Sequence, residues 1–182
     1  MRKIGILLLI LCTSTINAWE IEAKEHPKLK MVDEYLRFFK LDEKTLDKAG
    51  YTKLDVFTMA MTIYGEARGE NMRGKYAVAH VLNNRVIFND TSVVEEAFKN
   101  KQFTTWNIND KNLKAIVSAT QMYPANFIEL KDYFAISLRV ILGIHKDTTY
   151  EATHYYNPSL VTPYWSTSLQ ETITIGNHRF MK

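Results

Sequence analysis

Hydrophobic residues recur at helical spacing along most of this chain, and that spacing predicts a mainly helical protein. In the segment 54–67 apolar side chains return every three or four residues, while Gly65 and Gly69 weaken the helix towards its end. The segment 76–87 is apolar over much of its circumference, which predicts a buried helix. In chain order, helices are predicted at 32–41, 45–48, 54–67, 76–87, 93–98, 113–122 and 130–145, with an irregular stretch at 102–108.

Thr, Ile and aromatic residues replace the helical spacing near the C-terminus. Strands are predicted within 153–157 and 171–180. Inside the second stretch, Gly176-Asn177 separates two strand-like runs and is typical of a two-residue hairpin turn. The predicted fold class is therefore α+β, mostly helical with a small antiparallel sheet near the C-terminus.

Residues 1–18 have the order of a secretory signal peptide. A basic start, Met1-Arg2-Lys3, precedes an apolar run, and Ala18 is a small residue at the predicted cleavage point. The run is shorter than the roughly 20 apolar residues that span a bilayer, and an uncleaved anchor is the alternative. The mature protein is expected outside the cytoplasm, in the periplasm or cell wall, without stable membrane insertion after cleavage.

Residues 19–54 are predicted to form an N-terminal extension that precedes a catalytic domain at 55–182. The stretch 19–31 is charged and aperiodic, which is typical of a tail or linker. The short helices that follow it are expected to pack against the domain. Asp55 is predicted to cap the start of the helix that opens the domain.

Composition and charge exclude several function classes. The 182 residues are 46% hydrophobic and 24% charged, with a net charge of +3. Removal of residues 1–18 takes away Arg2 and Lys3 and leaves 21 basic and 20 acidic residues, a net charge of +1. Nothing in that balance predicts nucleic-acid binding, which needs a basic surface. The single Cys12 leaves with the signal peptide, so no disulfide, thiol nucleophile or thiolate metal site is expected.

Glu66 and Glu70 are the candidate acids. Four residues apart on a helix, they would share one face, where two carboxylates repel each other. The residues beside Glu66 are apolar, aromatic or small rather than lysines, and burial of a carboxyl raises its pKa. A raised pKa suits a general acid that protonates a leaving oxygen near neutral pH. The alternative interpretation is a solvated helix end with Arg68 as the partner of Glu66.

The signals for metal and nucleophile chemistry are weaker. No two of the five histidines have the i, i+4 spacing of a zinc helix, and no His-x-Glu or Cys-x-x-Cys accompanies them. A zinc site assembled from distant residues such as His80, His154 and His178 stays open. The chain contains no Gly-x-Ser-x-Gly motif and no phosphate-binding glycine loop.

Aromatic residues gather in turn-rich sequence after residue 150, in Tyr155-Tyr156-Asn157-Pro158 and Pro163-Tyr164-Trp165. Aromatic rings cover the apolar faces of sugars and amides bond their hydroxyls, so sugar binding is one interpretation. The other interpretation is a turn that holds the sheet together.

Several motifs follow one another in unbroken order between about Val56 and Phe180. They are Ile63-Tyr-Gly-Glu-Ala-Arg-Gly-Glu70, Gly74-Lys-Tyr-Ala-Val-Ala-His-Val-Leu-Asn-Asn-Arg-Val86, Gln102-Phe-Thr104, His154-Tyr-Tyr-Asn-Pro158, Pro163-Tyr-Trp165 and Ile175-Gly-Asn-His-Arg-Phe180. Together they resemble the signature of SleB-type cell wall hydrolases, a family of peptidoglycan-cleaving enzymes that includes spore-cortex-lytic members.

The resemblance implies a lysozyme-like fold and a lytic transglycosylase that acts on the glycan strands of peptidoglycan. It implies one catalytic glutamate, which by position is Glu66. The implied substrate-binding residues are Glu70, Gln102, Phe103, Thr104, Tyr155, Tyr156, Asn157, Trp165 and His178. No cofactor and no metal ligand is implied, and the protein is expected to act as a monomer.

Three other functions stay open from the residues alone. A hydrolytic muramidase or glucosaminidase would use water in place of the substrate's own hydroxyl. A secreted zinc amidase or peptidase would cut the peptide stems and stop when a chelator is added. A non-catalytic peptidoglycan-binding module would bind the wall and release nothing.

Overall fold

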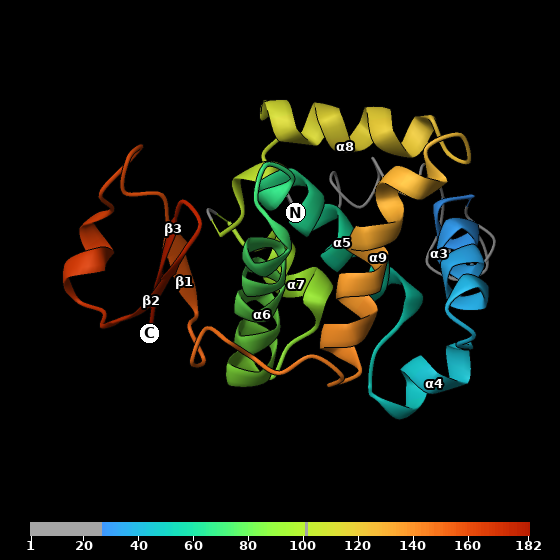
Figure 1. Cartoon of the computed structure of the whole chain (residues 1–182), viewed down its shortest axis with the longest axis horizontal. Coiled ribbons are helices and arrows are strands. Elements are labelled where there is room, and N and C mark those ends of the chain that lie inside the picture. Colours follow the sequence, from blue (N-terminus) through green and yellow to red (C-terminus); the bar gives the residue numbers. More distant parts are fainter. Residues whose placement is uncertain (1–26, 101) are drawn as a thin grey trace.

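The computed structural model describes residues 27–100 and 102–182. The predicted signal peptide and residues 19–26 of the predicted extension lie outside the described residues. The elements in chain order are α3 (Pro27–Phe38), α4 (Glu43–Lys48), α5 (Lys53–Ala67), α6 (Met72–Asn89), α7 (Val93–Phe98), the 3₁₀ turn η1 (Thr104–Trp106), α8 (Lys111–Gln121), α9 (Phe127–Ile141), β1 (His154–Tyr156), the 3₁₀ turn η2 (Tyr164–Thr167), β2 (Glu171–Ile175) and β3 (His178–Met181) (Figure 1). The predicted helices are all present, with shifted ends.

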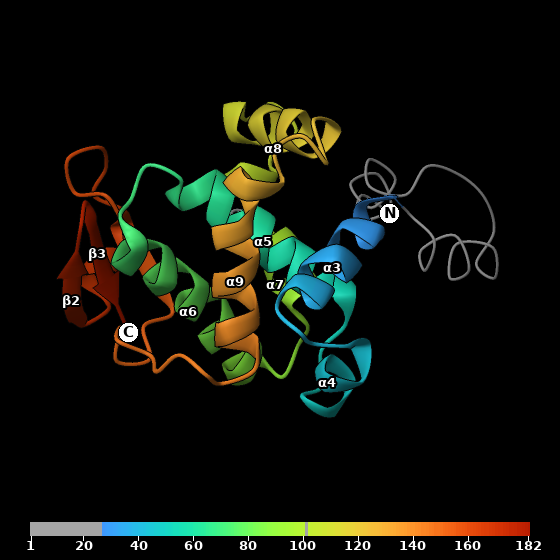
Figure 2. The same cartoon turned by 45° about the vertical axis from the view of Figure 1, so that its right-hand side comes forward.

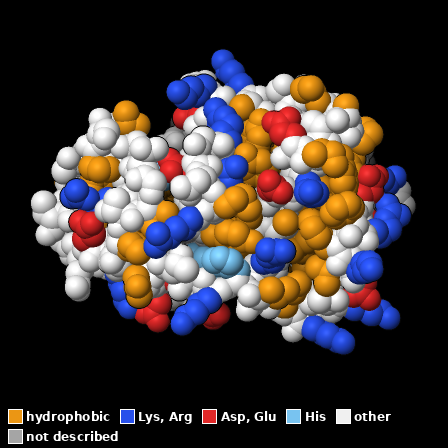
Figure 3. All heavy atoms as spheres, in the orientation of Figure 1, with side chains coloured by type: hydrophobic (Ala, Val, Ile, Leu, Met, Phe, Trp, Pro, Cys, Tyr) orange, Lys and Arg blue, Asp and Glu red, His pale blue; other side chains and the backbone are white. Residues whose placement is uncertain are grey.

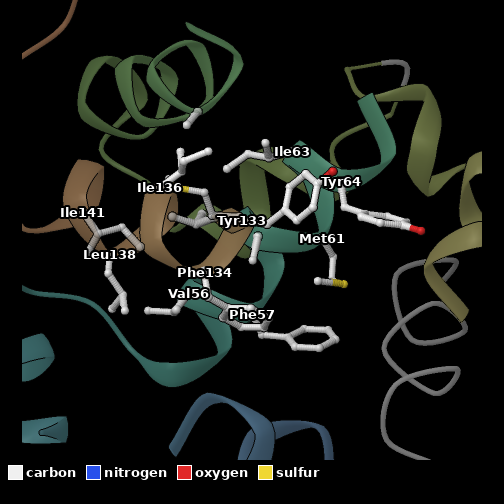
Figure 4. Close-up of a cluster of buried hydrophobic side chains, with 14 of the residues drawn as sticks. Val56, Phe57, Met61, Ile63, Tyr64, Tyr133, Phe134, Ile136, Leu138 and Ile141 are labelled. Carbon is white, nitrogen blue, oxygen red and sulfur yellow. The ribbon is translucent and has the colours of Figure 1, made fainter. Parts of the chain in front are cut away.

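α5 runs through the middle of the helical part and contacts α3, α6, α7, α8 and α9. Residues 55–65 are buried throughout, because neighbouring helices cover every side of α5. Figure 4 shows side chains of α5, such as Phe57 and Ile63, in one cluster with Phe134 and Ile136 of α9. Burying each large apolar side chain contributes roughly 1.5–3 kcal/mol, so this core holds α5 firmly in place.

The N-terminal segment packs more closely than its charge pattern predicted. The prediction of a tail or linker at 19–31 is wrong for residues 27–31, which form the first turns of α3. Tyr35 fastens α3 to α9, because its ring stacks between Phe127 and Phe134 at centroid distances of 4.4 and 4.1 Å. Its hydroxyl also donates to the Phe127 carbonyl at 2.8 Å. α3 is therefore stabilised by contacts with α9 that a local pattern cannot reveal.

The start of α5 is capped differently from the prediction. Thr52, not Asp55, is the N-cap residue, and its hydroxyl accepts a hydrogen bond from the Asp55 amide. The Asp55 carboxylate in turn accepts one from the Thr52 amide, which completes a capping box. α6 begins at Met72, four residues before the predicted helix at 76–87, and so includes Gly74.

The three strands form an antiparallel sheet in the order β1-β3-β2. The predicted hairpin joins β2 to β3 through Gly176, whose φ of +58° favours glycine. On the inner face of the sheet, Ile175 and Phe180 pack against Ala77 and Val81 of α6. Figures 1 and 2 both show the sheet at one end of the molecule beside α6, with α3 and α4 at the other end.

The surface of the described part offers no membrane-spanning element. Within residues 27–100 and 102–182, no helix combines the length and the apolar character needed to cross a bilayer. Figure 3 shows hydrophobic side chains gathered over the helical part of one face, with Lys and Arg side chains both among them and at the edge.

Candidate active site

Glu66 lies in the last turn of α5, one residue before the helix ends. Its Oε1 accepts hydrogen bonds from the Thr105 amide at 2.8 Å and from the Thr104 hydroxyl at 3.2 Å. Its Oε2 accepts one from the Tyr155 hydroxyl at 3.1 Å. The donors belong to η1 and β1, so three segments that are distant in sequence meet at one carboxyl.

Gly65 allows η1 to approach α5 this closely. A Cβ atom at Gly65 would lie 1.8 Å from Thr105 Oγ1 and 2.6 Å from Thr105 Cβ. Trp106 ties the same turn to α5 one helical turn earlier, because its indole N–H donates to the Thr62 hydroxyl at 2.9 Å. Gly65 therefore has a role in packing, because the absence of a side chain lets η1 lie against α5. The sequence indicated only that this glycine weakens the end of the helix.

Burial raises the pKa of Glu66 above its ordinary value, and it is the largest influence on this group. The hydrogen bonds from Thr105, Tyr155 and Thr104 act in the opposite direction, because they favour the carboxylate. The negative charge of Asp110 adds a smaller upward influence. The net result is a carboxyl that keeps its proton to higher pH than an exposed glutamate, as a general acid requires.

The raised pKa of Glu66 predicts a pH-dependent cost in stability. Below the ordinary value of 4.5 the carboxyl is protonated in both the folded and the unfolded state. At higher pH, up to the raised pKa, only the folded state keeps the proton, so the free energy of unfolding falls as pH rises. In Glu66→Gln the side chain does not ionise, so this contribution to the pH dependence is absent. Between about pH 4 and pH 8 its Tm should therefore fall less than that of the wild type, as followed by circular dichroism. Parallel Tm changes in the two proteins would contradict the raised pKa.

Tyr155 reaches Glu66 from β1 and is itself well packed. Its ring lies 5.0 Å from the ring of His178, edge to face, and 5.7 Å from that of Phe180. Burial, together with the charge of Glu66, raises the pKa of Tyr155 well above its ordinary value. The hydroxyl therefore keeps its proton to higher pH than an exposed tyrosine and remains a hydrogen-bond donor to Glu66.

Sequence reasoning missed the roles of Arg85 and Asp110. Arg85 is 7% exposed, donates through Nε to the Thr153 carbonyl, and lies over the Phe103 ring at 5.1 Å. It thus connects α6 to the segments that carry Thr104 and Tyr155. A basic residue within a helix predicted to be buried was the signal that could have identified it. Asp110 gave no comparable signal, because its effect on Glu66 depends on folding.

The structure separates Glu70 from the helical face that it was predicted to share with Glu66. α5 ends at Ala67, so Glu70 lies in the turn before α6. Its carboxylate accepts hydrogen bonds from the side chain and backbone of Asn177, in the turn between β2 and β3. Arg68, the alternative partner of Glu66, donates instead to the Gly65 carbonyl at 3.1 Å.

Several predicted substrate-binding residues lie away from Glu66. Strand alternation places Tyr155 on the inner face of the sheet and Tyr156 on the outer face. There Tyr156 packs edge to face with Trp165 at 5.7 Å, and Trp165 also packs against His154. Tyr156 and Trp165 thus lie on the face of the sheet away from the carboxyl, and their part in substrate binding stays a prediction.

Three other predicted residues have structural contacts. Asn157 accepts the Ser159 amide through its side chain at 2.9 Å, which makes it a turn residue. Phe103 is 2% exposed, and its ring packs against the Arg85 guanidinium. It is therefore part of the packing beneath the site and is not on its surface. Gln102 is partly exposed, and its backbone amide donates to the Lys99 carbonyl.

The histidines of the proposed zinc site do not converge. His80 pairs with His145 at 2.9 Å, His154 packs against Trp165, and His178 faces Tyr155. Within the described ranges, no three His, Cys, Asp or Glu side chains are grouped so that they could hold a metal ion. A zinc site built from His80, His154 and His178 is therefore wrong.

Comparisons with known proteins show the family to which the chain belongs. A family model described as Cell Wall Hydrolase matches residues 69–181, beginning just after Glu66. A spore cortex-lytic enzyme of Oceanobacillus iheyensis is 31% identical over 143 residues, which are 73% of this chain and 43% of that protein. A spore cortex-lytic enzyme of Bacillus cereus is 32% identical over 137 residues, which are 73% of this chain and 46% of that protein.

Solved structures extend the similarity to the fold. The catalytic domain of the Bacillus cereus SleB protein has a TM-score of 0.54 and 32% identity, covering 72% of this chain and 92% of that chain. The catalytic domain of the germination-specific lytic transglycosylase SleB from Bacillus anthracis has a TM-score of 0.54 and 30% identity. This match covers 73% of this chain and 98% of that chain. The predicted α+β, lysozyme-like class and the SleB-type resemblance are confirmed. The chain spans less than half the length of the curated relatives that it matches.

Proposed function

Because the chain belongs to the cell wall hydrolase family, we propose that it cleaves the glycan strands of peptidoglycan, with Glu66 as its single catalytic acid. The observation that carries this proposal is the Glu66 carboxyl, whose pKa is raised by burial and whose oxygens are held by Thr104, Thr105 and Tyr155. The similarity to a solved lytic transglycosylase supports the same reaction here.

The first step of the proposed reaction is proton transfer. Protonated Glu66 gives its proton to the glycosidic oxygen, the bond from that oxygen to C1 of the muramic residue breaks, and an oxocarbenium-like sugar forms. Thr104, Thr105 and Tyr155 then stabilise the carboxylate that remains, because all three donate hydrogen bonds to it.

The second step closes a ring within the substrate. The 6-hydroxyl of the same muramic residue attacks C1, and the Glu66 carboxylate takes the proton that this hydroxyl loses. The products are a 1,6-anhydromuramic end and a free hydroxyl on the neighbouring sugar, with no water consumed and Glu66 protonated again. Because the attacking group is already attached to the substrate, the step is unimolecular and needs no second carboxylate.

Hydrolysis by a muramidase or glucosaminidase is the competing reaction, and Asp110 is the residue that favours it. Its charge acts on Glu66, and an inverting glycosidase needs a second carboxylate as the base for water. Against that role, the Asp110 side chain accepts the Asn112 amide at 2.7 Å and caps α8. A residue used as a helix cap is less free to activate water.

Mass spectrometry of digested peptidoglycan tests the proposed products. Incubation of purified sacculi with the protein should release muropeptides with anhydro ends, and Asp110→Asn should release the same products. Reducing ends that carry oxygen from labelled water, lost in Asp110→Asn, would instead establish a hydrolase. Free stem peptides would establish an amidase, and the absence of any product would leave a binding module.

The place of action follows from the proposed substrate. Peptidoglycan lies outside the cytoplasm, so we propose that residues 1–18 direct export, that they are removed after it, and that the protein acts as a monomer on the cell wall. Neither nucleic acid nor a cofactor has a part in the proposed reaction.

A further inference from the structure

Glu70 is a buried carboxylate that the proposed mechanism does not use. Its side chain is 10% exposed. Oε1 accepts the side-chain amide of Asn177 at 2.9 Å, and Oε2 accepts the backbone amide of the same residue at 3.4 Å. Glu70 therefore connects the turn between α5 and α6 to the turn between β2 and β3.

Two glycines leave room for this contact. A Cβ atom at Gly176 would lie 2.1 Å from Oε2 of Glu70, and one at Gly74 would lie 2.8 Å from the Glu70 Cβ. Any larger residue at these positions would push the carboxylate away from the hairpin. The two segments are therefore shaped around Glu70.

The contact continues from Glu70 to the site through His178. His178 Nδ1 lies 3.9 Å from Oε1 of Glu70, and the edge of the ring contacts Tyr155. This nitrogen is buried and makes no hydrogen bond. β3, which begins at His178, also pairs with β1, where Tyr155 lies opposite Phe180. A shift of the hairpin would therefore change the packing of Tyr155 from two directions.

We propose that Glu70 is a positioning residue for Glu66. By holding the β2–β3 turn, and with it His178, it keeps the Tyr155 hydroxyl on Oε2 of Glu66. In this role Glu70 does not touch the substrate. The inference rests on the proposed function for its effect on activity, whereas the effect on the Glu66 carboxyl can be measured without any substrate.

The test compares Glu70→Ala, Tyr155→Phe and the double variant. The pKa of Glu66, followed by carboxyl ¹³C NMR, should rise in both single variants, because the Tyr155 hydrogen bond favours the carboxylate. Turnover of peptidoglycan should fall about tenfold to a hundredfold in each, as expected when a supporting group is misplaced. The high-pH limb of activity should move upward with the pKa.

The double variant gives the sharpest result. If Glu70 acts through Tyr155, the double variant should resemble Tyr155→Phe alone in both pKa and turnover. Glu70→Gln, which keeps an oxygen for Asn177, should recover most of the lost turnover. Additive losses, or an unchanged Glu66 pKa in a folded Glu70→Ala protein, would overturn the proposal.

Glu171→Ala is the matched control. Glu171 lies on the same hairpin and forms an exposed ion pair with Arg179 at 3.3 Å. Its removal tests general loosening of the hairpin, and it should leave turnover within about twofold, as for most exposed ion pairs. A loss equal to that of Glu70→Ala would overturn the proposal.

Two further measurements keep the outcomes separable. If Glu70→Ala does not fold, Asn177→Ala removes the side-chain hydrogen bond to Oε1 from the other side and must give the same coupling to Tyr155→Phe. Suppose that Glu66→Gln stays active, while Glu70→Ala and Tyr155→Phe still have non-additive effects on the pKa of Glu66. The proposed function then fails, and the positioning role of Glu70 stands.

Discussion

Glu66→Gln should fold like the wild type and lose between about a hundredfold and ten thousandfold of its turnover, the range that a general acid–base group contributes. Glutamine has nearly the shape of a protonated glutamic acid, and its carbonyl oxygen can still accept the Thr105 amide and the Thr104 hydroxyl. It has no acidic proton for the leaving oxygen. Release of soluble muropeptides from sacculi measures the loss, and circular dichroism checks the fold.

Glu171→Gln is the control for this variant, because it makes the same chemical change on an exposed side chain of the sheet. It should retain turnover. If Glu66→Gln retained turnover as well, Glu66 would not be the acid, and the proposed function would fail.

Gly65→Ala should disrupt the site without touching a catalytic atom. The added methyl group would meet Thr105 Cβ at 2.6 Å, and Thr105 is fully buried, so the backbone of η1 must move. Overpacking of this kind destabilises by about 1–3 kcal/mol. That exceeds the roughly 1 kcal/mol that alanine gains over glycine within a helix. Thermal unfolding should show a lower Tm.

The same displacement should reduce turnover. Thr105 donates the shortest of the hydrogen bonds to Glu66, and a displacement of about 1 Å at a catalytic group can cost about a hundredfold in rate. Gly69→Ala is the control, since a Cβ atom there would meet nothing within 4 Å. It should change stability by no more than about 0.5 kcal/mol. A Gly65→Ala protein as stable and active as Gly69→Ala would show that η1 does not need this close approach.

Local sequence determined most of the elements. The apolar spacing predicted each helix, because a 3.6-residue repeat marks the side of a helix that packs against its neighbours. Gly176-Asn177 likewise identified the hairpin, since few residues adopt the positive φ that its turn requires. The motif order from Val56 to Phe180 identified the family, and it singled out Glu66 as the candidate acid.

The errors arose where distant contacts outweigh local pattern. The charged start of α3 looked like a tail, yet the Tyr35 ring stacks on two aromatic residues of α9. The i, i+4 spacing of Glu66 and Glu70 suggested one helical face, yet α5 ends between them. Tyr155 and Tyr156 are adjacent in the sequence, yet neighbouring residues of a strand point to opposite faces, so Tyr155 contacts Glu66 and Tyr156 lies on the other face.

By itself, the sequence determined that Glu66 stands at the end of a buried helix and that a small sheet follows the helices. Only the tertiary structure decided what surrounds its carboxyl. The three donors come from Thr104, Thr105 and Tyr155, which lie 38, 39 and 89 residues further along the chain. Burial, and with it the raised pKa, exists only when these segments close over the carboxyl and exclude water. Because no local pattern carries such long-range contacts, Glu66 could be proposed as the acid from the sequence, whereas the environment that sets its pKa could not be predicted.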